Sequence, residues 1–174
     1  IAEKKIEKKL LEEKKEIESI EVGNIEERNL AVLVHLYHID IWEDIKKYLK
    51  ILYDSKVNYD LYVNISINDK NDIQNPEYKN LVDNINRLSI YNSVTITYSK
   101  NIGLDLGGFI KSYLKILELN LKYKHIIKIH SKQNTNWRFC MLYCLLGSEK
   151  IIKTNFKLLE TEKLGMIGNN KIRL

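Results

Sequence analysis

Three side chains that could bind an anion alternate along the segment Lys128-Ile-His-Ser-Lys132. In an extended strand this spacing places Lys128, His130 and Lys132 on the same side. Two cations and an imidazole on one face of a buried strand are costly unless they meet anions, and a diphosphate is the obvious partner. In the alternative interpretation both lysines extend to the strand ends and His130 is a hydrogen-bonded polar residue.

A glycine-bearing turn, Asn101 to Gly108, is the second place where chemistry could occur. Gly103 permits a positive φ, and Asp105 is placed to cap the helix that follows. Gly107 and Gly108 would let the start of that helix lie close to a ligand or to another backbone. The glycine spacing matches neither the dinucleotide fingerprint nor the phosphate loop. A capped strand-to-helix turn without a ligand is the alternative.

Two further segments carry side chains that suit a binding site. Arg138 could clamp a phosphate or carboxylate bidentately, whereas the neighbouring Trp137 could stack on a sugar or pack in the core. His35, His38 and Asp40 follow an apolar run, but their spacing fits no standard metal site. For His35 we therefore expect a role in a ligand loop or in the core.

Alternating strand and helix patterns must position these residues. Apolar runs predict strands at 30–37, 59–66, 93–98 and 124–130, with a short fifth strand at 164–168. Amphipathic patterns predict helices at 40–53, 76–88, 109–121, 137–146 and 149–159. Four alternations predict an α/β fold, a mostly parallel sheet with helices on both faces. Ligands of such sheets bind beyond the carboxyl ends of the strands, which is where the polar residues concentrate.

Composition limits the classes to consider. The chain has 174 residues, the length of one domain, and its 44% hydrophobic content excludes a wholly disordered chain. No apolar run reaches the length of a membrane-spanning helix. The net charge of +5 suits phosphate-bearing ligands, nucleic acid, an anionic surface or simply a solvated surface. Nucleic-acid binding is the weakest of these because the basic residues are dispersed. Cys140 and Cys144 have no second pair to complete a zinc site, and we expect buried thiols.

The N-terminal segment 1–28 differs from the rest because it is dense in lysine and glutamate. Apolar residues at near-helical spacing predict a solvated, charged helix that serves as an arm or linker. Residues 29–174 are then the globular domain. Because the chain begins at Ile1 without a signal-type segment, we expect a domain excised from a longer protein, with its C-terminal part truncated.

Several short motifs occur in an order that resembles the rhamnan synthesis protein F family. The resemblance covers about residues 29–170 and leaves 1–28 outside. Single motifs are weak, whereas the ordered set is fairly specific. The segments that carry it are Ala31–Tyr37, Tyr59–Asn64, Asn101–Asp105, Lys128–Lys132, Trp137–Arg138, Leu145–Ser148 and Leu164–Gly168.

This resemblance implies a GT-A-like, Rossmann-type fold and a hexosyltransferase that acts in polysaccharide assembly, with rhamnose from dTDP-rhamnose as the sugar transferred. GT-A enzymes usually end the fourth strand with an Asp-x-Asp that holds a metal on the donor diphosphate. Here the corresponding stretch is His130-Ser-Lys132. We therefore expect metal-independent transfer and no resident cofactor, although the sequence leaves open whether a divalent metal binds.

The resemblance also implies roles for individual residues. Lys132 and His130 would act as the catalytic groups that stabilise the departing nucleoside diphosphate. The general base has no candidate in this sequence. The remaining positions would bind substrate: Asn101, Gly103, Asp105, Lys128, Arg138 and His35.

A non-catalytic module is the rival interpretation: the same fold, kept to bind a nucleotide sugar or to dock a partner in a larger glycan-assembly protein. The expected partners are a dTDP- or UDP-sugar donor, a glycan acceptor and other domains of a longer chain, and not nucleic acid. The expected location is the cytoplasm, peripheral at a membrane through those other domains.

Overall fold

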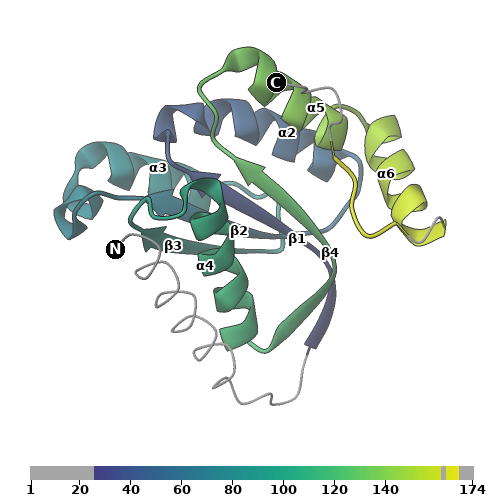
Figure 1. Ribbon diagram of the computed structural model, residues 1–174, viewed down its shortest axis with the longest axis horizontal. Coiled ribbons are helices and arrows are strands. Elements are labelled where there is room, and N and C mark those ends of the chain that lie inside the picture. The colour runs from purple at the N-terminus through teal and green to yellow at the C-terminus, as the bar shows by residue number, and fades with distance from the viewer. Residues whose placement is uncertain (1–25, 162–163, 169–174) are drawn as a thin grey trace, which may run out of the picture.

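The computed structural model describes residues 26–161 and 164–168 and forms a single parallel sheet with helices on both faces (Figure 1). The strand order is β3-β2-β1-β4, and every neighbouring pair is parallel. The predicted α/β class and the alternation of strands and helices are therefore confirmed. The strands are β1 (Glu26–Leu36), β2 (Asp60–Ser66), β3 (Ser93–Ser99) and β4 (Leu121–His130).

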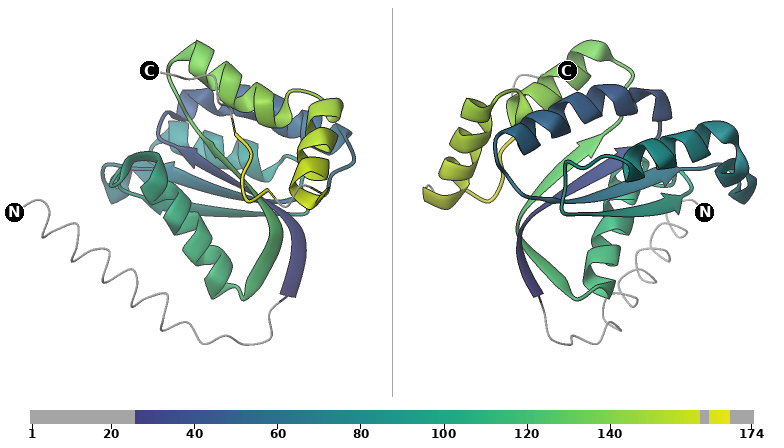
Figure 2. Two further views of the ribbon diagram at one scale, coloured as in Figure 1. Left: turned by 45° about the vertical axis from the view of Figure 1, so that its right-hand side comes forward. Right: turned by 180° about the vertical axis from the view of Figure 1, so that it is seen from behind.

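Helices cover the two faces of the sheet unequally (Figures 1 and 2). Among the described residues, α4 (Leu104–Glu118) covers one face, whereas four further α-helices share the opposite face. Those four are α2 (Trp42–Asp54), α3 (Pro76–Asn86), α5 (Thr135–Leu146) and α6 (Glu149–Thr161). Two short 3-10 helices, η1 (Ile39–Ile41) and η2 (Lys70–Gln74), precede α2 and α3.

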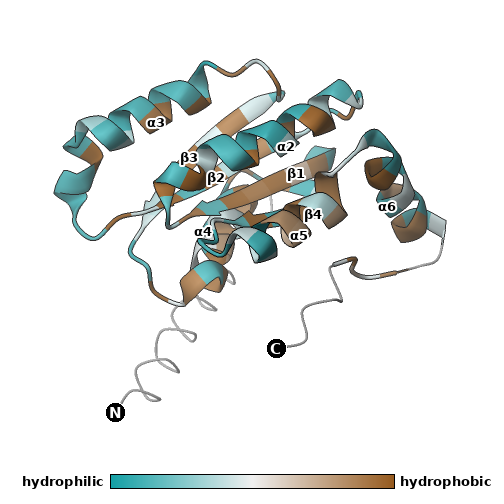
Figure 3. Cartoon of the chain, turned by 90° about the horizontal axis from the view of Figure 1, so that it is seen from above, coloured by the Kyte–Doolittle hydropathy of each residue, from teal (hydrophilic) through white to brown (hydrophobic). Residues whose placement is uncertain are grey.

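The central strand β1 supplies the middle of the core because both of its faces are covered. Val32 and Val34 are fully buried beneath the four-helix layer, whereas Ala31 and Leu33 are buried on the α4 face. Figure 3 shows this strand as a hydrophobic band between more polar helix surfaces. Burial of each large apolar side chain contributes on the order of 2 kcal/mol, so a continuous apolar run selects the central position.

The strand order creates one place where the chain changes direction across the sheet. The chain runs from β1 outward to β2 and β3, and then α4 returns it to the far side of β1 to form β4. The carboxyl ends of β1 and β4 therefore flank a switch point, where open α/β sheets bind ligands. His35 and His130 are register partners across this pair of strands, which places them side by side at the edge.

The structure corrects three predicted boundaries. Residues 164–168 form no strand within the described part of the chain, where they pair with no neighbour and leave Leu164 and Met166 exposed. Helix α4 begins at Leu104, not at residue 109, because Gly107 and Gly108 lie inside its first turns and do not delay it. Residues 26–28 belong to β1, where they pair with β4, and not to the predicted charged arm. The rest of that arm lies outside the described residues.

Candidate functional site

A cluster of charged side chains lies at the switch point, where β4 ends beside the start of α4. Lys128 donates from Nζ to Asp105 Oδ2 at 2.7 Å, and His130 Nδ1 lies 3.8 Å from the same oxygen. Lys128 and His130 come from β4, whereas Asp105 comes from the first turn of α4. The structure therefore brings three of the predicted residues together.

The electrostatics of this cluster depend on Asp105. Burial raises the pKa of the Asp105 carboxyl, but the hydrogen bond and charge of Lys128 outweigh burial, so the net pKa lies below its ordinary value. Burial lowers the pKa of His130, although the Asp105 charge acts in the opposite direction. Within the protein Lys128 is thus already neutralised by a carboxylate, and His130 favours its neutral form.

Lys132 lies two residues after β4 and, unlike Lys128, is not paired with a carboxylate in the described part of the chain. Its Nζ lies 4.1 Å from the centroid of the Trp137 ring, and within the described segments it forms no ion pair. A cation over an indole face is held by electrostatic attraction and keeps donors available for an anion. The ring of Trp137 thus contacts this lysine, and stacking of Trp137 on a sugar stays a prediction.

Arg138 holds the loop that carries Lys132. The residue is only 9% exposed, and its Nη1 donates to the carbonyl oxygens of Lys132 at 2.5 Å and Gln133 at 3.1 Å. Its Nη2 forms an ion pair with Asp44 Oδ2 on α2 at 3.0 Å. The predicted substrate contact of Arg138 remains a prediction, whereas its contacts in the structure fix the backbone after β4.

Ser131, which sequence reasoning did not select, joins the two loops that flank the switch point. Its Oγ accepts hydrogen bonds from the backbone N–H groups of Tyr37 and His38, both at 2.9 Å. Its own N–H donates to the carbonyl of His35 at 2.8 Å. In the sequence, a serine directly after a strand does not indicate a role in a site, because its hydrogen-bond partners are brought to it only by the pairing of β1 with β4.

His35 lies beneath the first turns of α4 and is 4% exposed. Asn64 Nδ2 donates to Thr97 Oγ1 at 3.1 Å, so the Asn64 Oδ1 atom is the acceptor that meets His35 Nδ1 at 2.9 Å. His35 therefore carries its proton on Nδ1, and its Nε2 is a buried acceptor without a partner among the described residues. Burial lowers the pKa of His35, which keeps the ring neutral.

We expect Gly108→Ala to destabilise the protein because His35 fills the space beside this glycine. A Cβ at residue 108 would lie 2.0 Å from His35 Nδ1, which forces the ring or the helix to move. Overpacking of this kind costs about 1–3 kcal/mol, measurable as a lower midpoint of thermal or urea unfolding. Gly165→Ala is the control, since its Cβ would meet nothing within 4 Å. Equal unfolding midpoints for both variants would contradict the close packing of His35 against Gly108.

The turn before α4 is formed by Gly103, which adopts φ +80° at the N-cap position of the helix. The expectation that Asp105 caps the helix is wrong, because its carboxylate faces Lys128 and no side chain caps α4. Gly107 packs closely here, and a Cβ on it would lie 1.9 Å from the Ile102 carbonyl oxygen. Asn101 is exposed beside this turn.

The described residues contain neither a cluster of metal ligands nor a membrane-spanning helix. No group of three or more His, Cys, Asp or Glu side chains in the described ranges is arranged to hold a metal ion. None of the helices that the structure describes is both long enough and apolar enough to span a membrane.

Comparison with known proteins gives one match. The model of the family described as rhamnan synthesis protein F matches residues 2–157, whereas no curated protein and no solved structure matches. The match begins well before residue 29, so the expectation that residues 1–28 lie outside the resemblance is wrong. It ends before Leu164–Gly168, which therefore does not belong to the matched region. Since the match spans most of the sequence, the chain belongs to the rhamnan synthesis protein F family, which indicates a role in the biosynthesis of a polysaccharide.

Proposed function

We propose that this chain is the donor-binding part of a GT-A-like glycosyltransferase that transfers rhamnose from dTDP-rhamnose to a growing glycan. The observation that carries the proposal is the position of Lys132, an uncompensated cation at the switch point of a parallel sheet. The nucleoside diphosphate of the donor is the anion that this position suits. Family membership supplies the polysaccharide context.

In the proposed reaction the bond between the sugar's anomeric carbon and the diphosphate oxygen breaks, and an acceptor hydroxyl oxygen forms the new bond to that carbon. The electron pair leaves with the diphosphate, where Lys132 stabilises the added charge. His130, the last residue of β4, donates a hydrogen bond to the leaving group. A base outside the residues assigned here takes the acceptor's proton.

The remaining predicted positions are proposed to bind the donor or to support the residues that bind it. Asp105 would exchange part of its contact with Lys128 for a sugar or ribose hydroxyl, which frees Lys128 for the diphosphate. Asn101 and Gly103 would shape the adjoining turn. Arg138 would act through the backbone of Lys132 that it holds. His35 would support α4 from below.

Transfer is proposed to be independent of a divalent metal, because the β4 terminus carries His130-Ser-Lys132 where an Asp-x-Asp would supply carboxylate ligands. We expect the transfer rate to be unchanged by EDTA, measured as release of dTDP from dTDP-rhamnose. Activity that disappears with EDTA and returns with Mn²⁺ contradicts this part of the proposal and leaves donor binding intact.

Donor binding is tested by thermal unfolding with dTDP-rhamnose and with UDP-sugars, followed by assays of donor hydrolysis and transfer. A ligand at 100 times its Kd stabilises the folded state by about 2.7 kcal/mol, which is a clear shift of the unfolding midpoint. Binding with turnover supports the transferase. Absence of any shift with every nucleotide sugar contradicts it.

The rival function is a module that binds a nucleotide sugar or docks a partner without catalysis. The observation that favours it is the Lys128–Asp105 pair, which neutralises one of the cations that catalysis would use. Binding without turnover is its expected result. In either case we propose a glycan acceptor and other domains of a longer chain as partners, no nucleic acid, and a cytoplasmic location peripheral to a membrane.

A further inference from the structure

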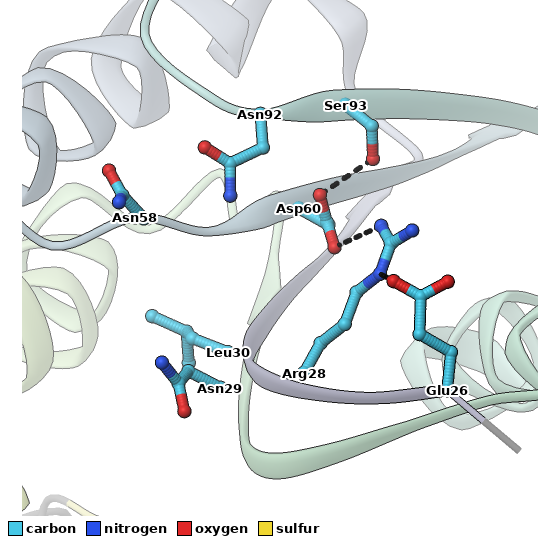
Figure 4. Close-up of a pocket in the computed structure, with 8 residues that line it drawn as sticks. All are labelled: Glu26, Arg28, Asn29, Leu30, Asn58, Asp60, Asn92 and Ser93. Atoms are coloured by element: carbon cyan, nitrogen blue, oxygen red, sulfur yellow. Dashed lines mark hydrogen bonds and ion pairs between the residues drawn. The ribbon is translucent and has the colours of Figure 1, made fainter.

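A pocket of about 540 Å³ lies at the amino-terminal edge of the sheet, opposite the switch point (Figure 4). This volume falls within the range of small-molecule sites. Its walls come from β1, from the loops that precede β2 and β3, and from the first residues of those strands. The lining residues are Glu26, Arg28, Asn29, Leu30, Asn58, Asp60, Asn92 and Ser93.

The floor of this amino-edge pocket is a preformed network around Asp60, which is 2% exposed. Its carboxylate accepts hydrogen bonds from Arg28 Nη1 at 2.8 Å, Ser93 Oγ at 2.7 Å and Tyr123 OH at 2.7 Å. Arg28 Nε donates in addition to Glu26 at 2.9 Å. The Asp60 carboxylate is thus hydrogen-bonded by three groups of the protein itself.

The rim of the pocket carries three exposed amide side chains from three different segments. Asn29 belongs to β1, Asn58 precedes β2, and Asn92 precedes β3. Figure 4 shows Asn58 and Asn92 along one side of the lining and Asn29 beside Leu30, with the Arg28–Asp60 pair across from them. Within the described part of the chain none of the three side chains makes a hydrogen bond. Each amide therefore offers donors and an acceptor to a ligand.

The charges of the lining identify the chemical class of ligand. Arg28 is the one lining cation, and it already pairs with two carboxylates, those of Glu26 and Asp60. A phosphate or carboxylate ligand would meet a net negative lining, which disfavours it. Amides beside a lining that repels anions instead suit an uncharged ligand rich in hydroxyl groups, each of which both donates and accepts.

We propose that the amino-edge pocket binds an uncharged, hydroxyl-rich segment of a glycan, at a site separate from the switch point. Seven-residue strand β2 separates the two edges, a span of roughly 20 Å at about 3.3 Å per residue. A glycan held there is anchored away from the reacting end. The pocket thus retains a polymer, and donor chemistry belongs to the opposite edge.

The test is a titration of the isotope-labelled chain with a short rhamnose oligosaccharide, followed by NMR and calorimetry. We expect saturable shifts of the Asn58 and Asn92 side-chain amide signals. The double variant Asn58→Ala, Asn92→Ala should raise Kd about tenfold or more, because two hydrogen bonds to the ligand are lost. Neither residue has a positive φ or a side-chain partner among the described residues, so both substitutions should leave the fold intact.

Asn80→Ala, an exposed asparagine on α3, is the matched control and should bind the oligosaccharide like the wild type. No saturable shift, equal affinity of the double variant, or displacement of the oligosaccharide from the pocket by dTDP-rhamnose overturns the inference. The proposed function is judged separately, since it requires dTDP-rhamnose to bind at the switch point. If the chain binds the oligosaccharide but no nucleotide sugar, the inference about the amino-edge pocket is supported and the proposed transferase function is contradicted.

Discussion

Lys132→Ala is expected to lower the rate of sugar transfer about 100-fold or more and to leave the free energy of unfolding nearly unchanged. The loss follows from the removal of a preorganised positive group from a site where negative charge develops, an effect of about 3 kcal/mol on the barrier. The stability is preserved because Lys132 is only partly buried and its side chain contacts the Trp137 ring, not a carboxylate. Steady-state release of dTDP measures the rate, and urea unfolding measures stability.

Lys124→Ala is the control for this experiment because it removes the same charge from the first half of β4, away from the switch point. Lys124 is exposed and pairs with Glu160 at 2.6 Å. Its loss should change neither rate nor stability by much, since exposed ion pairs contribute about 0–1 kcal/mol. Equal transfer rates for the Lys132 variant and the wild type would refute the assigned role.

Asp60→Ala is expected to destabilise the chain by about 3 kcal/mol. Three donors converge on the buried carboxylate, and removal of one partner of a buried pair leaves the others unsatisfied. We expect the lower end of the range of about 3–5 kcal/mol that is usual for a broken buried ion pair. The reason is that the Arg28 side chain is 33% exposed, so water can hydrate its guanidinium group in the variant. Chemical unfolding measures the change.

The contribution of Asp60 should also depend on pH. Burial raises the pKa of Asp60, but its hydrogen bonds from Arg28, Ser93 and Tyr123 outweigh burial and hold the folded-state pKa below the ordinary value of 3.8. A depressed pKa stabilises the folded state above the ordinary value, and this stabilisation is lost as the pH falls through the folded-state pKa. The wild type and the Asp60 variant should therefore converge in stability in strong acid.

Glu27→Ala provides the comparison, because Glu27 on β1 pairs with Lys122 on β4 near the same edge of the sheet but is exposed. Its effect should stay below about 1 kcal/mol. If both variants lose the same small amount of stability at neutral pH, the Asp60 network is not a supporting element of the amino edge.

The prediction of the fold succeeded where hydrophobic patterns were long. The apolar run of β1 predicts a strand buried on both faces, and Pro76 marks the start of α3, whose Asn75 cap accepts from Glu77 N at 3.0 Å. The fifth strand failed because a short apolar segment is compatible with a strand only where an edge is free to pair with it. The late start predicted for α4 failed because glycines in a first turn are tolerated when sheet packing requires small residues.

The prediction of the site was partial for a related reason. Lys128, His130 and Asp105 were selected from strand alternation and turn chemistry, and they do meet. Asn64 and Ser131 were missed because one polar residue inside an apolar run carries no signal of its partner. Asn64 can bond to both His35 and Thr97 only because β1 and β3 lie on either side of β2 in the folded sheet.

The sequence by itself determined the alternation of strands and helices, the central place of β1 and the edge at which polar residues collect. These follow from burial of apolar side chains, which periodicity reveals. Tertiary structure alone decided which charges are free. Lys128 and Lys132 are equivalent in the sequence, yet Asp105, brought across from α4, neutralises Lys128, whereas Lys132 contacts an aromatic ring. The physical reason is that electrostatic interactions depend on distances between residues far apart in the chain, and only the packed sheet sets those distances.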